Sequence, residues 1–231
     1  MQHFSIVILA AGMGTRLGRP FPKPLTQLGS GRSIMQSQLD NIERVFPGSA
    51  PHIVVGFKKE LIMEQFPDAV YLYNADYYET NTSKSLLRAL LRAAPGGILW
   101  LNGDVVFQPE VLEQFVPFIE RDQSVVSVNR ASVGEEEVKY TVDDDGFVLE
   151  LSKTVQGALG EAVGINYVSG ADRPTLLRHL DACGDQDYFE RAIETAIAAE
   201  KLRVCPLDIS AFAVLEVDFQ ADLDRANGLF S

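Results

Sequence analysis

The chain of 231 residues is poor in the residue types that build disulfides and most metal centres. Its two cysteines, Cys183 and Cys205, lack the C-x-x-C spacing of zinc and redox sites, so we expect reduced thiols that serve packing. The histidines, His3, His52 and His179, show no spacing typical of a metal site or a catalytic triad. A G-x-S-x-G motif is also missing, which leaves acyl transfer without a nucleophile.

Long hydrophobic runs are absent as well. Runs such as residues 4–11 fall far short of the ~20 apolar residues that a bilayer span needs, and no charged n-region with a cleavage site precedes them. We therefore expect a cytoplasmic protein with no membrane partner. Positive charge is scarce too, because 20 Lys and Arg against 32 Asp and Glu give a formal net charge of -12. This balance argues against a nucleic-acid partner, which a clustered basic face normally binds.

Apolar residues are plentiful, at 46% of the chain, which is ample for one core. Through the first 129 residues, segments typical of strands alternate with segments of helical periodicity. This alternation predicts a doubly wound, mostly parallel α/β sheet. The expected strands are residues 5–9, 52–55, 70–73, 98–101 and 125–129, and the expected helices are residues 33–45, 59–65, 83–94 and 110–120.

The pattern changes after residue 129. Residues 138–142 and 147–151 alternate on either side of an Asp-Gly turn, which predicts a β-hairpin inserted into the sheet domain. The acidic turn does not fit a calcium loop, because position twelve of that loop would be Ser152 and not Glu. We expect a single domain over residues 1–231.

The most informative segment follows the first strand, where an apolar run enters a glycine-rich turn. Backbone N–H groups can approach anionic oxygens closely at such a turn, because glycine has no Cβ and can adopt a positive φ. Arg16 and Lys23 follow at close range and would supply the compensating charge. The segment therefore predicts a cradle for phosphate groups.

Two other interpretations of this turn stay open. Gly12 and Gly14 could serve only the geometry of a strand-to-turn junction. With Gly18 they also form a loose dinucleotide-binding pattern. That pattern requires an acidic residue after the next strand, which hydrogen-bonds the ribose. Residues 56–59 there read Gly-Phe-Lys-Lys, although an NADP site could use the lysines.

Residues 9–23 resemble the signature of the nucleotidyltransferases that join a nucleoside triphosphate to a phosphorylated small molecule, L-A-A-G-x-G-T-R-L followed by P-K. The segment is not a P-loop, because no Gly-Lys-Ser/Thr closes it. The resemblance implies an enzyme with a Rossmann-like fold and a Mg²⁺ cofactor, in which Arg16 and Lys23 are catalytic. It implies nucleotide contacts from Leu9, Ala10, Ala11, Gly12, Met13, Gly14 and Thr15.

Acidic residues at two strand ends are the expected metal ligands. Asp104 follows a predicted strand at the edge where open α/β sheets bind ligands, and these transferases place a magnesium-binding Asp there. Glu216 and Asp218 resemble the late E-x-D segment that brings a second carboxylate to the metal, although Phe219 replaces the Thr common at the next position. A divalent metal would also reconcile the acidic chain with an anionic substrate. The alternatives are a turn or cap role for Asp104 and a helix cap at Asp218.

Residues 74–86 fit the N-x-x-Y-x-x-T-N-x-x-x-S-L pattern of transferases that use CTP and small phospho-alcohols or phosphonates. The resemblance implies nucleotide contacts from Asn74, Thr80, Asn81 and Ser85. Ordinary capping of the following helix by Thr80, Asn81 or Thr82 is the alternative, and both can hold together.

The acceptor side is expected from the second half of the chain. In the resembling enzymes a lysine matched by Lys153 contacts the acceptor phosphate, and the G-E-x-V-G-I segment at residues 160–165 lines the acceptor pocket. A solvated surface charge is the alternative for Lys153. A choline acceptor would need an aromatic cage, for which the chain offers few walls, so we expect a phosphonate or another small phospho-alcohol. The expected acceptor residues are Lys139, Lys153, Glu161 and Tyr188.

The sequence thus predicts that an acceptor oxygen attacks the α-phosphorus of CTP, releasing pyrophosphate by positioning and charge neutralisation. Residues of about 1–129 would bind the nucleotide, and residues of about 130–231 the acceptor. Two alternatives stay open: a sugar-1-phosphate nucleotidyltransferase that uses UTP, dTTP or GTP, and a non-catalytic nucleotide-sensing module. The expected partners are CTP or another nucleoside triphosphate and a small phosphorylated or phosphonate acceptor, and a homodimer is left open.

Overall fold

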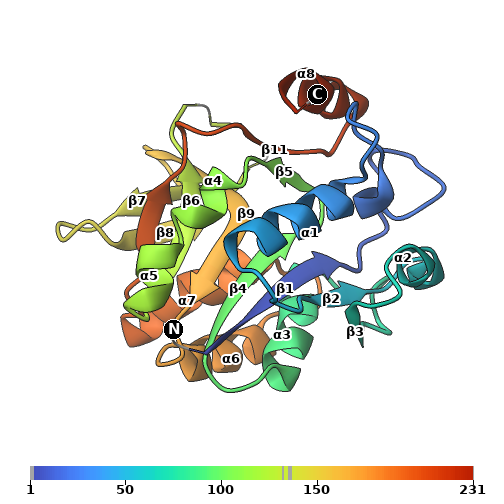
Figure 1. Ribbon diagram of the computed structural model, residues 1–231. Helices are drawn as coiled ribbons and strands as arrows, with labels where there is room; N and C mark the ends of the chain where they lie inside the picture. The colour runs from blue at the N-terminus through green and yellow to red at the C-terminus, as the bar shows by residue number, and fades with distance from the viewer. Residues whose placement is uncertain (1–2, 132, 135–136, 231) are drawn as a thin grey trace.

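The computed structural model describes residues 3–131, 133–134 and 137–230. In this part of the chain one sheet runs through the centre of the molecule in the order β10-β6-β9-β4-β1-β2-β3, with β7 and β8 attached at β9 (Figure 1). Its strands are β1 (Phe4–Ala10), β2 (His52–Val55), β3 (Val70–Tyr73), β4 (Gly97–Asn102), β6 (Val125–Asn129), β7 (Lys139–Val142), β8 (Val148–Ser152), β9 (Gly160–Val168) and β10 (Cys205–Asp208).

Helices cover both faces of this sheet. Ile6 and Ile8 of β1 point into a core with α1, α2, α4 and α5, whereas Val7 and Leu9 point into a second core with α3, α6 and α7. A strand buried on both faces explains the continuous apolar run at the start of the chain. The helices are α1 (Ile34–Val45), α2 (Lys59–Gln65), α3 (Thr82–Arg92), α4 (Glu110–Glu113), α5 (Val116–Glu120), α6 (Arg173–Ala182), α7 (Phe189–Glu200) and α8 (Gln220–Leu229), with a short 3-10 turn, η1 (Lys23–Leu25).

The mostly parallel α/β sheet predicted from the sequence is confirmed. β1 pairs in parallel with β2 and β4, β2 with β3, and β6 with β10. Among the elements that the sequence did not predict is β9, which lies antiparallel between β4 and β6. The two alternating segments after residue 129 form β7 and β8, which pair antiparallel, and β7 continues onto β9.

The prediction of one continuous helix over residues 110–120 is wrong. The segment is divided into α4 and α5, and Pro117 lies in the first turn of α5. Proline has no N–H to donate, and its ring clashes with the carbonyl four residues earlier, which here belongs to Glu113. That residue is the last of α4.

A second, two-stranded sheet brings the segment around Asp218 beside the segment around Asp104. β11 (Val214–Glu216) pairs antiparallel with β5 (Val105–Phe107), and α8 packs beside them, apart from the main layers (Figure 1). β11 ends at Glu216, two residues before Asp218. The Val217 N–H donates to the Asp104 carbonyl at 3.0 Å. This bond carries Asp218 to the end of β4, more than a hundred residues away in the sequence.

Over the described ranges, no helix has the length and apolar character to cross a membrane.

Candidate active site

A cavity of about 320 Å³ opens at the carboxyl ends of β1 and β4. This is the edge at which open α/β sheets bind ligands. Its walls come from the end of β1 and the loop after it, Asn102–Asp104 at the end of β4, the start of α3, the start of α7, and the end of β11 with Asp218. The segment before β7, Lys153 after β8, and β9 line it as well.

The loop after β1 presents unused backbone donors to this cavity. Gly14 has φ +60°, and a Cβ there would lie 3.0 Å from the Lys23 Cβ, so glycine is required. The Ala11 carbonyl accepts a hydrogen bond from the Phe57 N–H at 3.0 Å, which fixes the loop. Among the described residues, none accepts a hydrogen bond from the N–H groups of residues 12–15. The loop can therefore hold an anion with its backbone.

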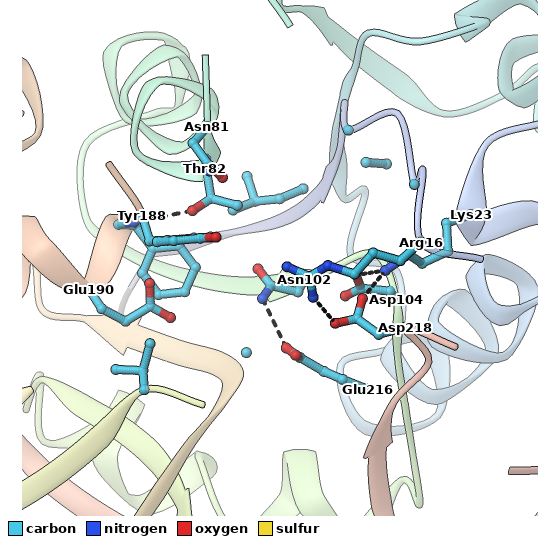
Figure 2. A pocket seen from close by; sticks show the side chains of 18 of the residues that line it. Arg16, Lys23, Asn81, Thr82, Asn102, Asp104, Tyr188, Glu190, Glu216 and Asp218 are labelled. Atoms are coloured by element: carbon cyan, nitrogen blue, oxygen red, sulfur yellow. Dashed lines mark hydrogen bonds and ion pairs between the residues drawn. The ribbon is translucent and has the colours of Figure 1, made fainter. Parts of the chain in front are cut away.

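Below the loop lies an ionic cluster that we call the cation–acid cluster: Arg16, Lys23, Asp104 and Asp218. Lys23 Nζ lies 2.8 Å from Asp104 Oδ2 and also contacts Asp218 Oδ1. Arg16 pairs with the other oxygen of Asp218 at 2.5 Å (Figure 2). Asp104 and Asp218, which the sequence predicts to converge, lie together here with Arg16 and Lys23.

The pKa values of the cluster follow from burial and opposite charge. Burial favours the neutral amine of Lys23, but Asp104 and Asp218 outweigh it and raise its pKa. Burial also disfavours the Asp218 carboxylate, yet Lys23 and Arg16 hold the pKa of Asp218 below its ordinary value. Both shifts favour the ionised forms of Lys23 and Asp218.

The carboxylates of this cluster suit a small divalent cation. The inner oxygen of Asp104, Oδ1, is buried and has no hydrogen-bond partner among the described residues. Glu216 Oε1 accepts from Asn102 Nδ2 at 3.2 Å, and burial together with the charge of Asp104 raises the pKa of Glu216. In the described part of the chain, no three His, Cys, Asp or Glu side chains form a complete metal cage. Two carboxylates completed by substrate oxygens and water are the ligand set typical of Mg²⁺.

The predicted nucleotide residues fall into two groups. Leu9, Ala10, Gly12, Gly14 and Thr15 line the cavity, whereas Ala11 and Met13 lie outside its lining.

The later nucleotide segment divides in the same way. Asn74 is buried and donates from Nδ2 to Thr80 Oγ1 at 3.0 Å and to Ser85 Oγ at 3.1 Å, so these three side chains satisfy one another outside the cavity. Asn81 lines the cavity and caps α3, with its Oδ1 accepting from the Thr82 N–H at 2.8 Å. For Asn81 the capping interpretation holds together with a place at the site.

The predicted acceptor residues are also divided. Lys153 and Tyr188 line the cavity, and Lys153 Nζ lies 4.8 Å from the centre of the Tyr188 ring. Glu161 lines a neighbouring cavity of about 510 Å³ instead, and its Oε2 accepts from the Gly134 N–H at 2.8 Å. Lys139 lies in the lining of neither cavity and donates to the Lys153 carbonyl at 3.3 Å.

Several lining residues were not predicted from the sequence. Asn102 and Thr82 adjoin predicted residues, so proximity could have suggested them. Gly164, by contrast, belongs to the 160–165 segment that the sequence predicts at the acceptor pocket, and a Cβ there would lie 2.7 Å from Asn102 Nδ2 and 2.9 Å from Glu216 Oε1. Glu190, in the first turn of α7, carries no sequence signal, since acids are common at helix starts.

Comparison with known proteins agrees with this geometry. The chain belongs to the family of the MobA-like NTP transferase domain, whose model matches residues 6–200. It is similar to a 2-aminoethylphosphonate cytidylyltransferase from Lancefieldella rimae, with 24% identity covering 96% of this chain and 91% of the relative. It is also 28% identical to a CMP-5'-(3-aminopropyl)phosphonate synthase from Streptomyces rubellomurinus, over 97% of this chain but 38% of the relative's length.

The fold matches a solved structure over its whole length. The CTP:phosphocholine cytidylyltransferase from Streptococcus pneumoniae superposes with a TM-score of 0.76 at 17% identity, covering 99% of both chains. Family, site and relatives together identify a nucleotidyltransferase.

Proposed function

We propose that this protein transfers CMP from CTP to a small phosphonate and releases pyrophosphate. The observation that carries the proposal is the position of Lys23, which bridges Asp104 and Asp218 below a loop with unused N–H groups. Both relatives named above act on aminoalkylphosphonates, which supports CTP as donor and a phosphonate as acceptor.

The reaction needs no general base. A phosphonate oxygen is already anionic at neutral pH, so its lone pair can form the new bond to the α-phosphorus directly. The bond between the α- and β-phosphates breaks, and pyrophosphate leaves with the electron pair. Catalysis then consists of alignment and charge stabilisation.

The residues divide this work by charge. Backbone N–H groups of residues 12–15 would hold the triphosphate, and Arg16 and Lys23 would neutralise it. Asp104 and Asp218 would hold Mg²⁺, with Glu216 and Asn102 beside them. When bound, the ion would withdraw charge from the reacting phosphoryl oxygens. Lys153 would contact the acceptor phosphonate.

A grid of substrates tests the proposal. Pyrophosphate release is measured with CTP, UTP, dTTP, ATP and GTP, each against 2-aminoethylphosphonate, phosphocholine and glucose 1-phosphate, with Mg²⁺ present. We expect CTP with the phosphonate to exceed the purine triphosphates clearly, because a site built to satisfy one base edge leaves its own groups unpaired with another.

Other outcomes would replace the proposal. A preference for UTP or dTTP with the hexose phosphate would assign the chain to the sugar branch. Nucleotide binding without pyrophosphate release from any pair would indicate a sensing module.

A further inference from the structure

The cavity wall opposite the cation–acid cluster is formed by the start of α7, and we call Tyr188, Phe189 and Glu190 the α7 wall (Figure 2). Two contacts fix its position. The Phe189 N–H donates to Thr82 Oγ1 at 3.1 Å, and the Phe189 ring packs edge-on against Trp100 with centroids 5.4 Å apart. Glu190 follows this anchored residue and lines the cavity.

Glu190 is a buried acid without an ion pair to any described residue, and the nearby charge of Lys153 only partly offsets the effect of burial on its pKa. It is 8% exposed and lines the cavity, and no other described side chain forms a hydrogen bond or ion pair with its carboxylate. Burial raises the pKa of Glu190 to about 7. An unpaired buried carboxylate costs stability, so its retention at this wall points to a ligand that supplies the missing positive charge.

Tyr188 adds a second feature that favours a cation. Its ring is 38% exposed, and the Lys153 ammonium lies 4.8 Å from its centre, which shows that positive charge is accepted at this face. The neighbouring ring of Phe189 is 1% exposed and turned to Trp100. The α7 wall therefore combines one aromatic face with one carboxylate.

This combination distinguishes between kinds of ammonium group. A trimethylammonium group has no N–H to donate, so it is bound by several aromatic faces together. A primary ammonium has three N–H donors, and a carboxylate satisfies them by charge-assisted hydrogen bonds. One ring and one acid suit the primary amine.

We infer that Glu190 determines acceptor specificity by holding the primary ammonium of a zwitterionic aminophosphonate beside Tyr188. The inference deepens the proposed function and rests on it. Because Lys153 lies over the Tyr188 ring, the phosphonate at Lys153 and the ammonium at Glu190 would be bound at adjoining places, with the phosphonate on the side of the cation–acid cluster.

The test compares three acceptors that differ only at the end away from phosphorus. They are 2-aminoethylphosphonate, propylphosphonate, in which a methyl replaces the amine, and 2-(trimethylammonio)ethylphosphonate. We expect the wild-type protein to prefer the primary amine over both others by ~10² or more in kcat/KM, because the analogues leave the buried carboxylate unpaired. In Glu190→Gln this preference should fall to about tenfold or less, with most of the change in KM for the amine.

Glu200→Gln is the matched control, since it lies at the opposite end of α7, about 15 Å along the helix, and pairs with Arg178. This variant should keep the wild-type preference. Thermal unfolding of Glu190→Gln establishes that the variant is folded.

The outcomes separate the two proposals. If no phosphonate supports pyrophosphate release, the proposed function fails, and the inference with it. If phosphonates react but the amine gives no advantage, or if Glu190→Gln keeps the full preference, the inference alone is overturned.

Discussion

The two walls of the cavity hold their charges in opposite ways. In the cation–acid cluster, Lys23 contacts two carboxylates and Arg16 contacts one of them. At the α7 wall, Glu190 is buried without an ion pair to any described residue. Among the described residues, one wall pairs its charges within the protein, and the other leaves one charge without an ion pair.

The two walls should therefore respond differently to a ligand. At the cation–acid cluster a ligand would exchange existing ion pairs for new ones, whereas at Glu190 it would add an ion pair. When phosphates arrive at the cation–acid cluster, Lys23 and Arg16 must share their contacts between carboxylates and substrate. When an ammonium arrives at Glu190, an ion pair forms where none existed. Removal of a carboxylate should therefore destabilise the protein at the first wall and stabilise it at the second.

The largest expected effect is at the paired carboxylates. Asp104→Asn and Asp218→Asn should each reduce kcat/KM by ~10³ or more, because under the proposed function the Mg²⁺ that would stabilise transition-state charge would lose a ligand. The double variant should be little worse than either single variant, since both changes destroy one site. A double-mutant cycle with Mg²⁺ titrated in every variant measures this.

Asp224→Asn is the control for that cycle. Asp224 is exposed on α8 and accepts only from Gln220 in the described contacts, so its loss should leave turnover and Mg²⁺ dependence as in the wild type. Defects that simply multiply, with an unchanged Mg²⁺ requirement, would show that the two acids do not share an ion.

The next effect in size belongs to the cation between them. Lys23→Ala should reduce kcat/KM by on the order of 10², from loss of a charge donor in a site with little water. It should also lower the melting temperature, because Asp104 and Asp218 then face each other without the ammonium. Lys59→Ala is the control, since it removes a half-buried lysine that pairs with Glu60 and lies outside the lining of the cavity. Turnover close to wild type in a folded Lys23→Ala protein would contradict the assignment of Lys23.

The residues of the cation–acid cluster could be predicted from the sequence, whereas those of the α7 wall mostly could not. The cluster depends on residues that lie close together in the sequence or at strand ends. The loop after β1 places glycines, Arg16 and Lys23 within fifteen residues, and strand ends in an open sheet indicate where Asp104 must lie. Asp218 was found through a motif, and its approach to Asp104 depends on the β11–β5 pairing.

The acceptor side depends on contacts that no short pattern encodes. β9 is buried on both faces and inserts antiparallel between β4 and β6, a register that only the tertiary fold selects. Glu190 looks like an ordinary acid in the first turn of a helix, which favours negative charge there. Its burial results from the packing of Phe189 on Trp100 and Thr82.

The smallest expected effect is a change in the free energy of unfolding with pH, and it tests Glu190 of the α7 wall directly. The pKa of Glu190 is raised from its ordinary 4.5 to about 7, chiefly by burial, with Glu137 adding to the shift and Lys153 opposing it. The folded chain therefore holds this proton to higher pH than the unfolded chain, so the stability of the wild type falls as pH rises from about 4.5 through about 7. Each pKa unit corresponds to about 1.4 kcal/mol, which sets an upper bound of about 3 kcal/mol.

Glu190→Gln removes that penalty while keeping the shape of the side chain. Urea unfolding should find the variant more stable than the wild type at pH 8, by about 1–3 kcal/mol, and the difference should shrink toward zero at pH 5. Glu200→Gln should show the opposite sign, because Arg178 and His179 lower the pKa of Glu200 and the variant loses those contacts. The contradicting result is a stability difference between Glu190→Gln and wild type that is the same at pH 8 and pH 5. It would mean that the Glu190 carboxylate already has a partner within the protein, and the contrast between the two walls would disappear.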